Sequence, residues 1–397
     1  MQKPAIVGGT PVRSNPLYYG HQYIDEADIE AVTKVLKSDY LTCGPAITEL
    51  EHKLCELTGA KYAVAVSNGT AALHIACMAA GLGVGDELIT TPITFAASAN
   101  CALYCGATPV FADINEKTYN IDPVEINKKI NEKTKVIVAV DFTGQAADME
   151  PIMEMAAQKG IVVIEDAAHS IGTKYQGKAI GSIADMTTFS FHPVKTVTSG
   201  EGGAVLTNSK EYYDKLCLYR THGITRDPAF LEKESHGPWY YEQIDLGYNY
   251  RLTDIQAALL ISQLDKLELF SNRRKEIVAR YNEAFSKMTE LVVQEEIPET
   301  DTTRHLYILR IRPEMLKIDR KEFFLAMAAE KIHCNVHYIP VYHHPHYERL
   351  GFQKGICPQA EALYETMMSL PLYYAMSDED VDDVILAVQK IVEYYRK

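Results

Sequence analysis

The stretch "KYAVAVSNGTAALHIACMAAGL" (Lys61–Leu82) decides the fold class. Its first seven residues form an apolar, β-rich run that predicts a strand, and the run beginning at Gly69 has the composition of a buried helix. The same alternation continues through "DELITTP", "TFAASANCALYCG", "TPVFADI", "KVIVAVDFTG" and "GIVVIEDAA". Strands that are apolar on both faces and separated by helices form parallel sheets covered on both sides. We therefore predict an α/β fold built on a mostly parallel sheet.

The alternation of strand and helix patterns ends at residue 208. The longest helical pattern, Thr253–Met288, follows, and a smaller segment closes the chain with the strand "HLYILRI" and the helix "DEDVDDVILAVQKIVEYY". We therefore predict a large α/β domain with an N-terminal helical segment at residues 1–265, and a smaller C-terminal α+β domain at residues 266–397. No Gly/Ser-rich linker lies between them, so we expect the two parts to pack firmly.

The bulk composition is that of an ordinary globular protein. Of the 397 residues 47% are hydrophobic and 23% charged, and the net charge of −14 argues against a nucleic-acid-binding surface. No signal-peptide pattern and no run of 18 apolar residues occurs in the sequence, so we expect a cytoplasmic protein without a membrane partner. The eight cysteines lack paired spacing, which favours buried thiols over a disulfide framework or a metal site.

Four motifs stand where predicted strands end, which is where open α/β sheets bind their ligands. "VSNGTAAL" places Gly69 and Thr70 at a helix N-terminus, a position that suits a phosphate group. "VIEDAAHS" ends a buried strand at Asp166, "SFHPVK" ends at Lys195, and "TPITFAAS" contains Phe95. Each motif alone also has an ordinary structural interpretation: a helix cap, a loop lysine or a core phenylalanine.

Taken together, the four motifs predict a pyridoxal phosphate site. A lysine amine condenses with the cofactor aldehyde, and a buried carboxylate keeps the ring nitrogen protonated. We assign these tasks to Lys195 and Asp166, with Phe95 stacking on the ring and the helix end at Gly69 binding the phosphate.

The order and wording of the motifs resemble the sugar aminotransferases of the DegT/DnrJ/EryC1/StrS family, which have the PLP-dependent transferase type I (aspartate aminotransferase-like) fold. The resemblance covers nearly the whole chain and includes "LTCGP", "VSNGTAAL", "VIEDAAHS", "FSFHPVK", "GEGGAV" and "GYNYRLTDIQAALL". Within the family, "VDFTGQAADM", "RTHGI" and "GPWYYEQIDLGYNYRLTD" look most like the UDP-4-amino-4,6-dideoxy-N-acetyl-β-L-altrosamine transaminases of pseudaminic acid synthesis.

The resemblance implies roles for particular residues. The cofactor-binding set that it implies is Gly69, Thr70, Ala71, Phe95, Asp166, His169, Ser190, Lys195 and Asn249. His192 is a third catalytic candidate beside Lys195 and Asp166. Asn249 matches an asparagine that reaches a phosphate in the neighbouring subunit, which implies a homodimer with shared active sites. The alternative is that Asn249 only caps the helix that follows it.

The resemblance also implies the reaction. Dehydratase relatives carry histidine where the transaminases carry the cofactor-binding lysine, so Lys195 favours amino transfer. The expected donor is L-glutamate, leaving as 2-oxoglutarate, and the expected acceptor is a UDP-linked 4-keto-6-deoxy-N-acetylhexosamine. Two alternatives stay open: a TDP- or GDP-linked keto sugar, and a non-catalytic regulatory protein on the same fold.

Overall fold

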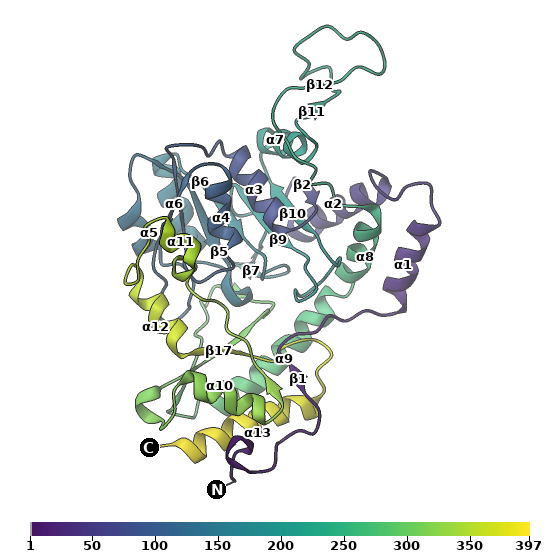
Figure 1. Ribbon diagram of the computed structural model, residues 1–397. Helices are drawn as coiled ribbons and strands as arrows, with labels where there is room; N and C mark the ends of the chain where they lie inside the picture. The colour runs from purple at the N-terminus through teal and green to yellow at the C-terminus, as the bar shows by residue number, and fades with distance from the viewer. Residues whose placement is uncertain (1) are drawn as a thin grey trace.

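The computed structural model describes residues 2–397, and its largest sheet has seven strands in the order β2-β10-β9-β6-β5-β3-β4 (Figure 1). The strands are β2 (Tyr62–Val66), β3 (Glu87–Thr90), β4 (Thr108–Phe111), β5 (Thr134–Val140), β6 (Val162–Asp166), β9 (Met186–Ser190) and β10 (Gly203–Thr207). Strand β10 runs antiparallel to both of its neighbours, and the other neighbouring strands pair in parallel. The predicted mostly parallel sheet is therefore confirmed.

Helices cover both faces of this sheet. One face carries α2 (Pro45–Thr58), α5 (Pro123–Lys129), α6 (Met149–Lys159) and α8 (Asp254–Leu264); the other carries α3 (Gly69–Ala79), α4 (Ala97–Tyr104) and α7 (Lys210–Arg220). Along β2, Ala63 and Ala65 belong to the first core, whereas Val64 and Val66 belong to the second. This alternation explains why the strands are apolar at every position, since both faces are buried.

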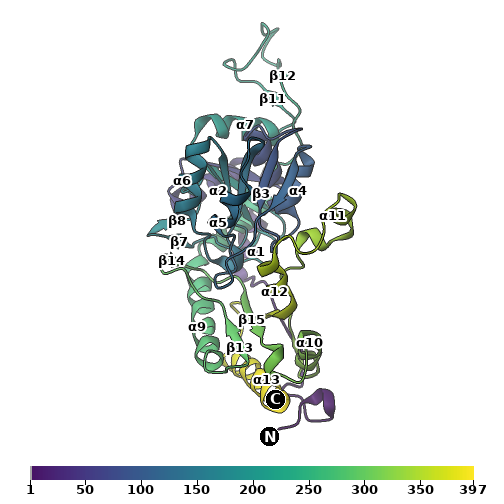
Figure 2. The same cartoon turned by 90° about the vertical axis from the view of Figure 1, so that its left-hand side faces the viewer.

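A smaller antiparallel sheet of β13 (Leu291–Val293), β15 (Tyr307–Ile311) and β17 (Met367–Leu370) has its own core. It packs with α9 (Leu267–Phe285), α10 (Arg320–Ala329) and α13 (Asp378–Tyr395), and lies below the large sheet in Figure 2. Helix α9 joins the two cores, because Leu267 and Phe270 pack in the large one while Ile277 and Tyr281 pack in the small one.

The helical stretch predicted over residues 253–288 is divided into α8 and α9, because the first helix ends at Leu264 and the second begins at Leu267. Lys266 lies at this break, and its amine donates to Asp25 and Asp28 of the α1 region, at 2.7 Å each. Helix α1 (Glu26–Leu36) is thereby fastened to the junction between the two long helices.

The N-terminal segment packs on the smaller unit. Strand β1 (Leu17–Tyr18) pairs in parallel with β16 (Ile332–His333). The fully buried carboxylate of Glu330 accepts hydrogen bonds from the backbone amides of Ala5 and Val12, each at 2.8 Å, and from the amine of Lys390 at 2.9 Å. The boundary placed at residue 265 stays a prediction, and these contacts place residues 4–18 beside the C-terminal elements.

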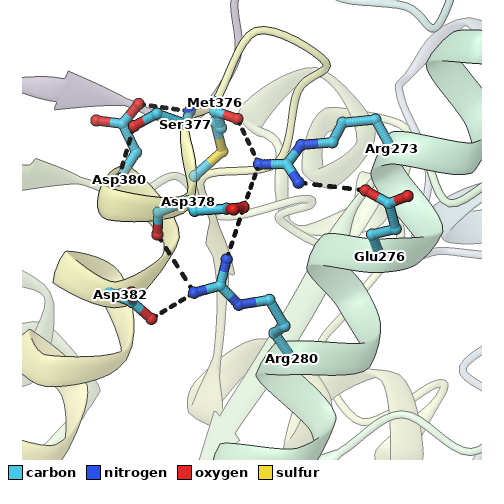
Figure 3. A network of polar contacts seen from close by, with 8 residues as sticks. All are labelled: Arg273, Glu276, Arg280, Met376, Ser377, Asp378, Asp380 and Asp382. Atoms are coloured by element: carbon cyan, nitrogen blue, oxygen red, sulfur yellow. Dashed lines mark hydrogen bonds and ion pairs between the residues drawn. The ribbon is translucent and has the colours of Figure 1, made fainter.

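Helices α9 and α13 are also joined by a polar network (Figure 3). Arg273 and Arg280 both donate to the carboxylate of Asp378 at 2.9 Å, and Arg280 also pairs with Asp382. Ser377 caps the N-terminus of α13. Because the carboxylates of Asp378 and Asp382 are well exposed, the ion pairs contribute little stability individually and serve mainly to orient the two helices.

The remaining elements are short. They are α11 (Pro345–Arg349), α12 (Pro358–Thr366), β7 (Lys174–Tyr175), β8 (Lys178–Ala179), β11 (Ile224–Thr225), β12 (Glu242–Gln243), β14 (Thr300–Asp301) and the 3-10 turns Ala5–Val7, Phe142–Gly144, Pro313–Met315 and Val341–His343. The β11–β12 hairpin extends away from the large sheet in both views, and its Trp239 is 71% exposed (Figures 1 and 2). Within residues 2–397 no helix combines the length and apolarity that a membrane crossing requires.

Candidate active site

A cavity of about 950 Å³ opens at the strand ends of the large sheet. Its walls come from the start of α3, the turn before α4, the ends of β6 and β9, and the segment that follows β9. The predicted site residues that line it are Gly69, Thr70, Ala71, Phe95, Asp166, His169, Ser190, His192 and Lys195. Residues spread over more than 120 positions of sequence are thus brought to one place because the carboxyl ends of parallel strands share one edge of the sheet.

The anion-binding end of the cavity is the N-terminus of α3. Asn68 caps this helix by accepting a hydrogen bond from the amide of Ala71 at 2.8 Å. A Cβ atom at Gly69 would lie 2.9 Å from the Cβ of Ser190, so glycine lets the helix end pack directly against the end of β9. The amides of Gly69 and Thr70 belong to the first turn, which has no intrahelical acceptors and carries the positive end of the helix dipole.

The carboxyl group of Asp166 also lines the cavity. It is 5% exposed, and it accepts from the hydroxyl of Ser98 at 2.6 Å and from the amide of Ala168 at 3.2 Å. Burial raises the pKa of Asp166, while the contacts with Ser98 and Ala168 and the charge of Lys195 act to lower it. No helix begins between Asp166 and Met186 in the described chain, so Asp166 is not a helix cap.

Lys195 stands in the turn after β9, where its amide donates to the carbonyl of His192 at 2.9 Å. Burial lowers the pKa of the Lys195 amine to about 8, and the carboxylate of Asp166 opposes this effect only in part. At neutral pH about a tenth of this amine is therefore uncharged, far more than for an ordinary lysine, and the uncharged form is the one that attacks a carbonyl carbon. The side chain of His192 lines the same cavity but is exposed at its mouth.

His169 lines the cavity but is almost fully buried. Its Nε2 is 3.1 Å from the hydroxyl of Tyr338, and its ring centroid is 4.4 Å from that of His305. Burial holds the pKa of His169 well below its ordinary value, so the imidazole is neutral. Its Nδ1 atom is buried and has no hydrogen-bond partner among the described residues. Buried polar atoms usually have a partner, so an unpaired Nδ1 is suited to a ligand.

Phe95 is 63% exposed, which excludes the core interpretation of this residue. Its ring lines the cavity and meets the edge of Tyr338 with ring centroids 6.4 Å apart. A large aromatic face directed into a cavity is suited to stacking on a flat ligand.

Several further residues line the cavity that sequence reasoning did not find. They are Tyr19, His74, Ser98, Tyr104, Tyr248, Tyr250, His337 and Tyr338. Tyr248 and Tyr250 are stacked at 5.0 Å, and the hydroxyl of Tyr250 lies 3.1 Å from Nδ1 of His74. Ser98 ends the "TPITFAAS" motif that already supplies Phe95, and Tyr248 and Tyr250 flank Asn249 in "GYNYRLTD", so these three could have been found from the sequence.

Asn249 is exposed and does not line the cavity of its own chain. It forms a β-bridge with Thr221, and α8 is capped instead by Thr253, whose side chain accepts from the amide of Gln256. The cap interpretation of Asn249 is therefore excluded. A role for Asn249 in the site of a second subunit remains a proposal.

The residues present fit pyridoxal phosphate. The helix end offers amides to a phosphate, and Phe95 offers a face to a ring. Burial raises the pKa of the Asp166 carboxyl group although the charge of Lys195 acts to lower it, and a protonated ring nitrogen would supply a further cation. Lys195 supplies the amine, and Nδ1 of His169 is free to contact a ring substituent.

Residues 22–389 match the model of the DegT/DnrJ/EryC1/StrS aminotransferase family, and the chain belongs to this family. It is 42% identical over 383 residues to the spore coat polysaccharide biosynthesis protein SpsC of Bacillus subtilis, covering 96% of this chain and 98% of that protein. It is 37% identical over 383 residues, with the same coverage of both chains, to the UDP-4-amino-4,6-dideoxy-N-acetyl-beta-L-altrosamine transaminase of Campylobacter jejuni.

Solved structures show the same architecture. PseC of Helicobacter pylori, described as an aminotransferase involved in the biosynthesis of pseudoaminic acid, matches with a TM-score of 0.88 at 32% identity over 96% of this chain and all of that chain. Spr1654 of Streptococcus pneumoniae in its PLP form matches with a TM-score of 0.88 at 32% identity, over 96% of this chain and 100% of that chain. The type I fold predicted from the sequence is confirmed by these similarities.

Proposed function

We propose that this sugar aminotransferase moves an amino group from L-glutamate to C4 of a UDP-linked 4-keto-6-deoxy-N-acetylhexosamine, acting in the cytoplasm as a homodimer with shared sites. Family membership supports the aminotransferase activity and pyridoxal phosphate as its cofactor. The UDP-linked substrate is supported by the name of the Campylobacter relative, which is similar over nearly its full length. The similarity to PseC supports a role in the synthesis of an amino sugar.

The observation that carries the proposal is the meeting of Lys195 and Asp166 at one cavity with the N-terminus of α3. An amine with a lowered pKa and a carboxyl with a raised one are costly to maintain at one site. A regulatory protein that only bound a sugar nucleotide would need neither group. The arrangement therefore favours catalysis over the regulatory alternative.

When bound, pyridoxal phosphate supplies a ring that draws electrons from the carbon bearing the transferred amino group. The first turn of α3 and the hydroxyl of Ser190 would bind its phosphate, and Phe95 would cover one face of its ring. Asp166 would hold a proton on the ring nitrogen, because a charge pair in a dry site favours both charged forms. Nδ1 of His169 would contact the ring hydroxyl.

Lys195 also has a task as an acid and base. Its neutral amine would accept a proton from the α-carbon of the amino donor, and its ammonium form would return a proton to C4 of the sugar. With a pKa of about 8, the amine is mostly charged at neutral pH and about a tenth of it is neutral, so both forms are available to a group that must do both. We place His192 at the mouth of the cavity, where it would meet the incoming substrate.

The proposal is tested with purified enzyme loaded with pyridoxal phosphate and given L-glutamate and a panel of UDP-, TDP- and GDP-linked 4-keto-6-deoxy sugars. We expect 2-oxoglutarate release with the highest kcat/KM for the UDP-N-acetyl sugar. Lys195→Ala should bind the cofactor without turning over. A higher kcat/KM with a TDP or GDP sugar would refute the UDP assignment. Failure with every sugar, while L-glutamate still converts the cofactor, would refute the acceptor class.

A further inference from the structure

Asp166 is held by a short chain of hydroxyl groups. Ser98 Oγ lies 2.6 Å from Oδ2 of Asp166, and Thr94 Oγ1 lies 2.7 Å from Ser98 Oγ. Thr94 is 4% exposed and Ser98 is 1% exposed, so water does not compete for these contacts. Thr94 comes from the turn that leads into α4, Ser98 from the first turn of α4, and the carboxyl group from the end of β6.

The direction of the hydrogen bonds follows from the number of protons. The single proton of Ser98 could go to the carboxylate of Asp166 or to the carbonyl of Phe95, which is 3.2 Å away. A charged carboxylate at 2.6 Å is the stronger acceptor, so the proton goes to Asp166. The oxygen of Ser98 is then left to accept from Thr94. Both hydroxyls therefore point toward the carboxylate when it is charged.

The two oxygens of Asp166 are held from different sides. Oδ2 accepts from Ser98, and Oδ1 accepts from the amide of Ala168 at 3.2 Å. With both oxygens bonded, the plane of the carboxylate is fixed toward the cavity. Phe95 lies between Thr94 and Ser98 in the sequence, so one short segment at the start of α4 places both the stacking ring and the support of the acid.

We propose that Ser98, supported by Thr94, is a positioning residue that keeps Asp166 charged and aimed at the ring nitrogen of the cofactor. This inference rests on the proposed aminotransferase function. It assigns to the "TPITFAAS" motif a task that is separate from ring stacking by Phe95. Ser98 acts through Asp166 and takes no part in the proton transfer itself.

The chain offers a matched control on the adjacent strand. Ser170 Oγ donates to Oδ2 of Asp141 at 2.6 Å, the same length as the Ser98 contact. Asp141 is 0% exposed, follows the end of β5 and does not line the cavity. Removing the hydroxyl of Ser170 therefore deletes an equivalent buried hydrogen bond to a carboxyl group that has no part in the proposed chemistry.

The test compares Ser98→Ala, Ser98→Thr, Thr94→Val and Ser170→Ala, each loaded with pyridoxal phosphate. The first measurement is the single-turnover rate with L-glutamate, followed by the visible absorbance of the cofactor. The second is the pH dependence of that rate. Neither measurement requires the sugar substrate.

We expect Ser98→Ala to react about tenfold to a hundredfold more slowly, as loss of a hydrogen bond to a charged group implies, with half-saturation by L-glutamate little changed. The acid limb of its pH profile should move to higher pH, because the Ser98 contact lowers the pKa of Asp166 and its removal raises it. Ser98→Thr should restore most of the rate, and Thr94→Val should lose about threefold, a weaker effect of a neutral hydrogen bond. Ser170→Ala should keep the rate and the profile.

The inference fails if Ser98→Ala matches the parent enzyme in rate and pH profile, or if Ser170→Ala slows the reaction equally. Should Ser98→Ala not fold, Thr94→Val decides: an unchanged rate would overturn the hydroxyl chain. A parent enzyme that does not react with L-glutamate would refute the proposed function instead, so the two failures are distinguishable.

Discussion

Replacing Asp166 by Asn tests the electrostatic core of the proposed site. The substitution keeps the size of the side chain and an oxygen that can accept from Ser98, but it removes the negative charge. Two unit charges about 4 Å apart attract by about 4 kcal/mol at an effective dielectric constant of about 20. Asp166 is 5% exposed, so solvent screens such a pair weakly. Loss of that attraction in the transition state corresponds to a rate about a thousandfold lower.

The assay is the half-reaction with L-glutamate, measured by stopped-flow absorbance of the bound cofactor. Circular dichroism and the melting temperature report whether the fold survives. Asp141→Asn serves as the control, because Asp141 is a fully buried carboxyl group just after the neighbouring strand β5 and does not line the cavity. We expect Asp141→Asn to change stability and to leave the half-reaction within about threefold of the parent rate, a change of about 0.7 kcal/mol.

The reasoning would be refuted by a folded Asp166→Asn enzyme whose half-reaction rate stays within about tenfold of the parent, about 1.4 kcal/mol. The carboxyl group would then serve only to hold Ser98 and Ala168, and the ring nitrogen would not need a charged partner. An equal loss in Asp141→Asn would also refute it, because a general effect of burying an amide would then explain both results.

Three other results are expected. Capture of pyridoxal phosphate by the cofactor-free protein, followed by stopped-flow absorbance, should accelerate as the pH rises through about 8 and then level off, because only the neutral Lys195 amine reacts. A capture rate that keeps rising beyond about pH 10 would contradict this. Glu330→Ala should lower the free energy of unfolding by about 3–5 kcal/mol in urea titrations, because the charged amine of Lys390 is left buried without its carboxylate partner. A loss below about 1 kcal/mol would show that water replaces the carboxylate. Mixing inactive Lys195→Ala chains with inactive Asn249→Asp chains should restore activity if sites are shared across a dimer; continued inactivity after verified subunit exchange would exclude sharing.

The elements of the large sheet could be predicted because their signals are local. Helix α6 (Met149–Lys159) is an example, since its apolar residues recur with the helical period and Gly160 follows in the left-handed region. The site could be outlined for a related reason: Asp166 and Lys195 are chemically conspicuous residues at strand ends, and parallel strands end at one edge.

The remaining features depend on contacts between distant segments, which leave no local pattern. The break between α8 and α9 follows from the reach of Lys266 back to Asp25 and Asp28, and no glycine or proline marks it. Tyr19 and Tyr338 line the same cavity although more than 300 residues separate them. Their proximity depends on the pairing of β1 with β16, which no local sequence pattern indicates.

The opposite pKa displacements of Lys195 and Asp166 have a common origin. Burial disfavours charge on both groups, so it lowers the pKa of the amine and raises that of the acid. A surface optimised for stability alone would place both groups in water. Here burial outweighs the compensation that each group receives. The charge of Asp166 offsets only part of the effect on the amine, and the contacts with Ser98 and Ala168 together with the charge of Lys195 offset only part of the effect on the carboxyl group. A ligand that offers an aldehyde to the one and a cationic nitrogen to the other relieves both costs at once. Before such a ligand binds, the hydrogen bond from Ser98, which Thr94 supports, already offsets part of the cost of burying the charge of Asp166.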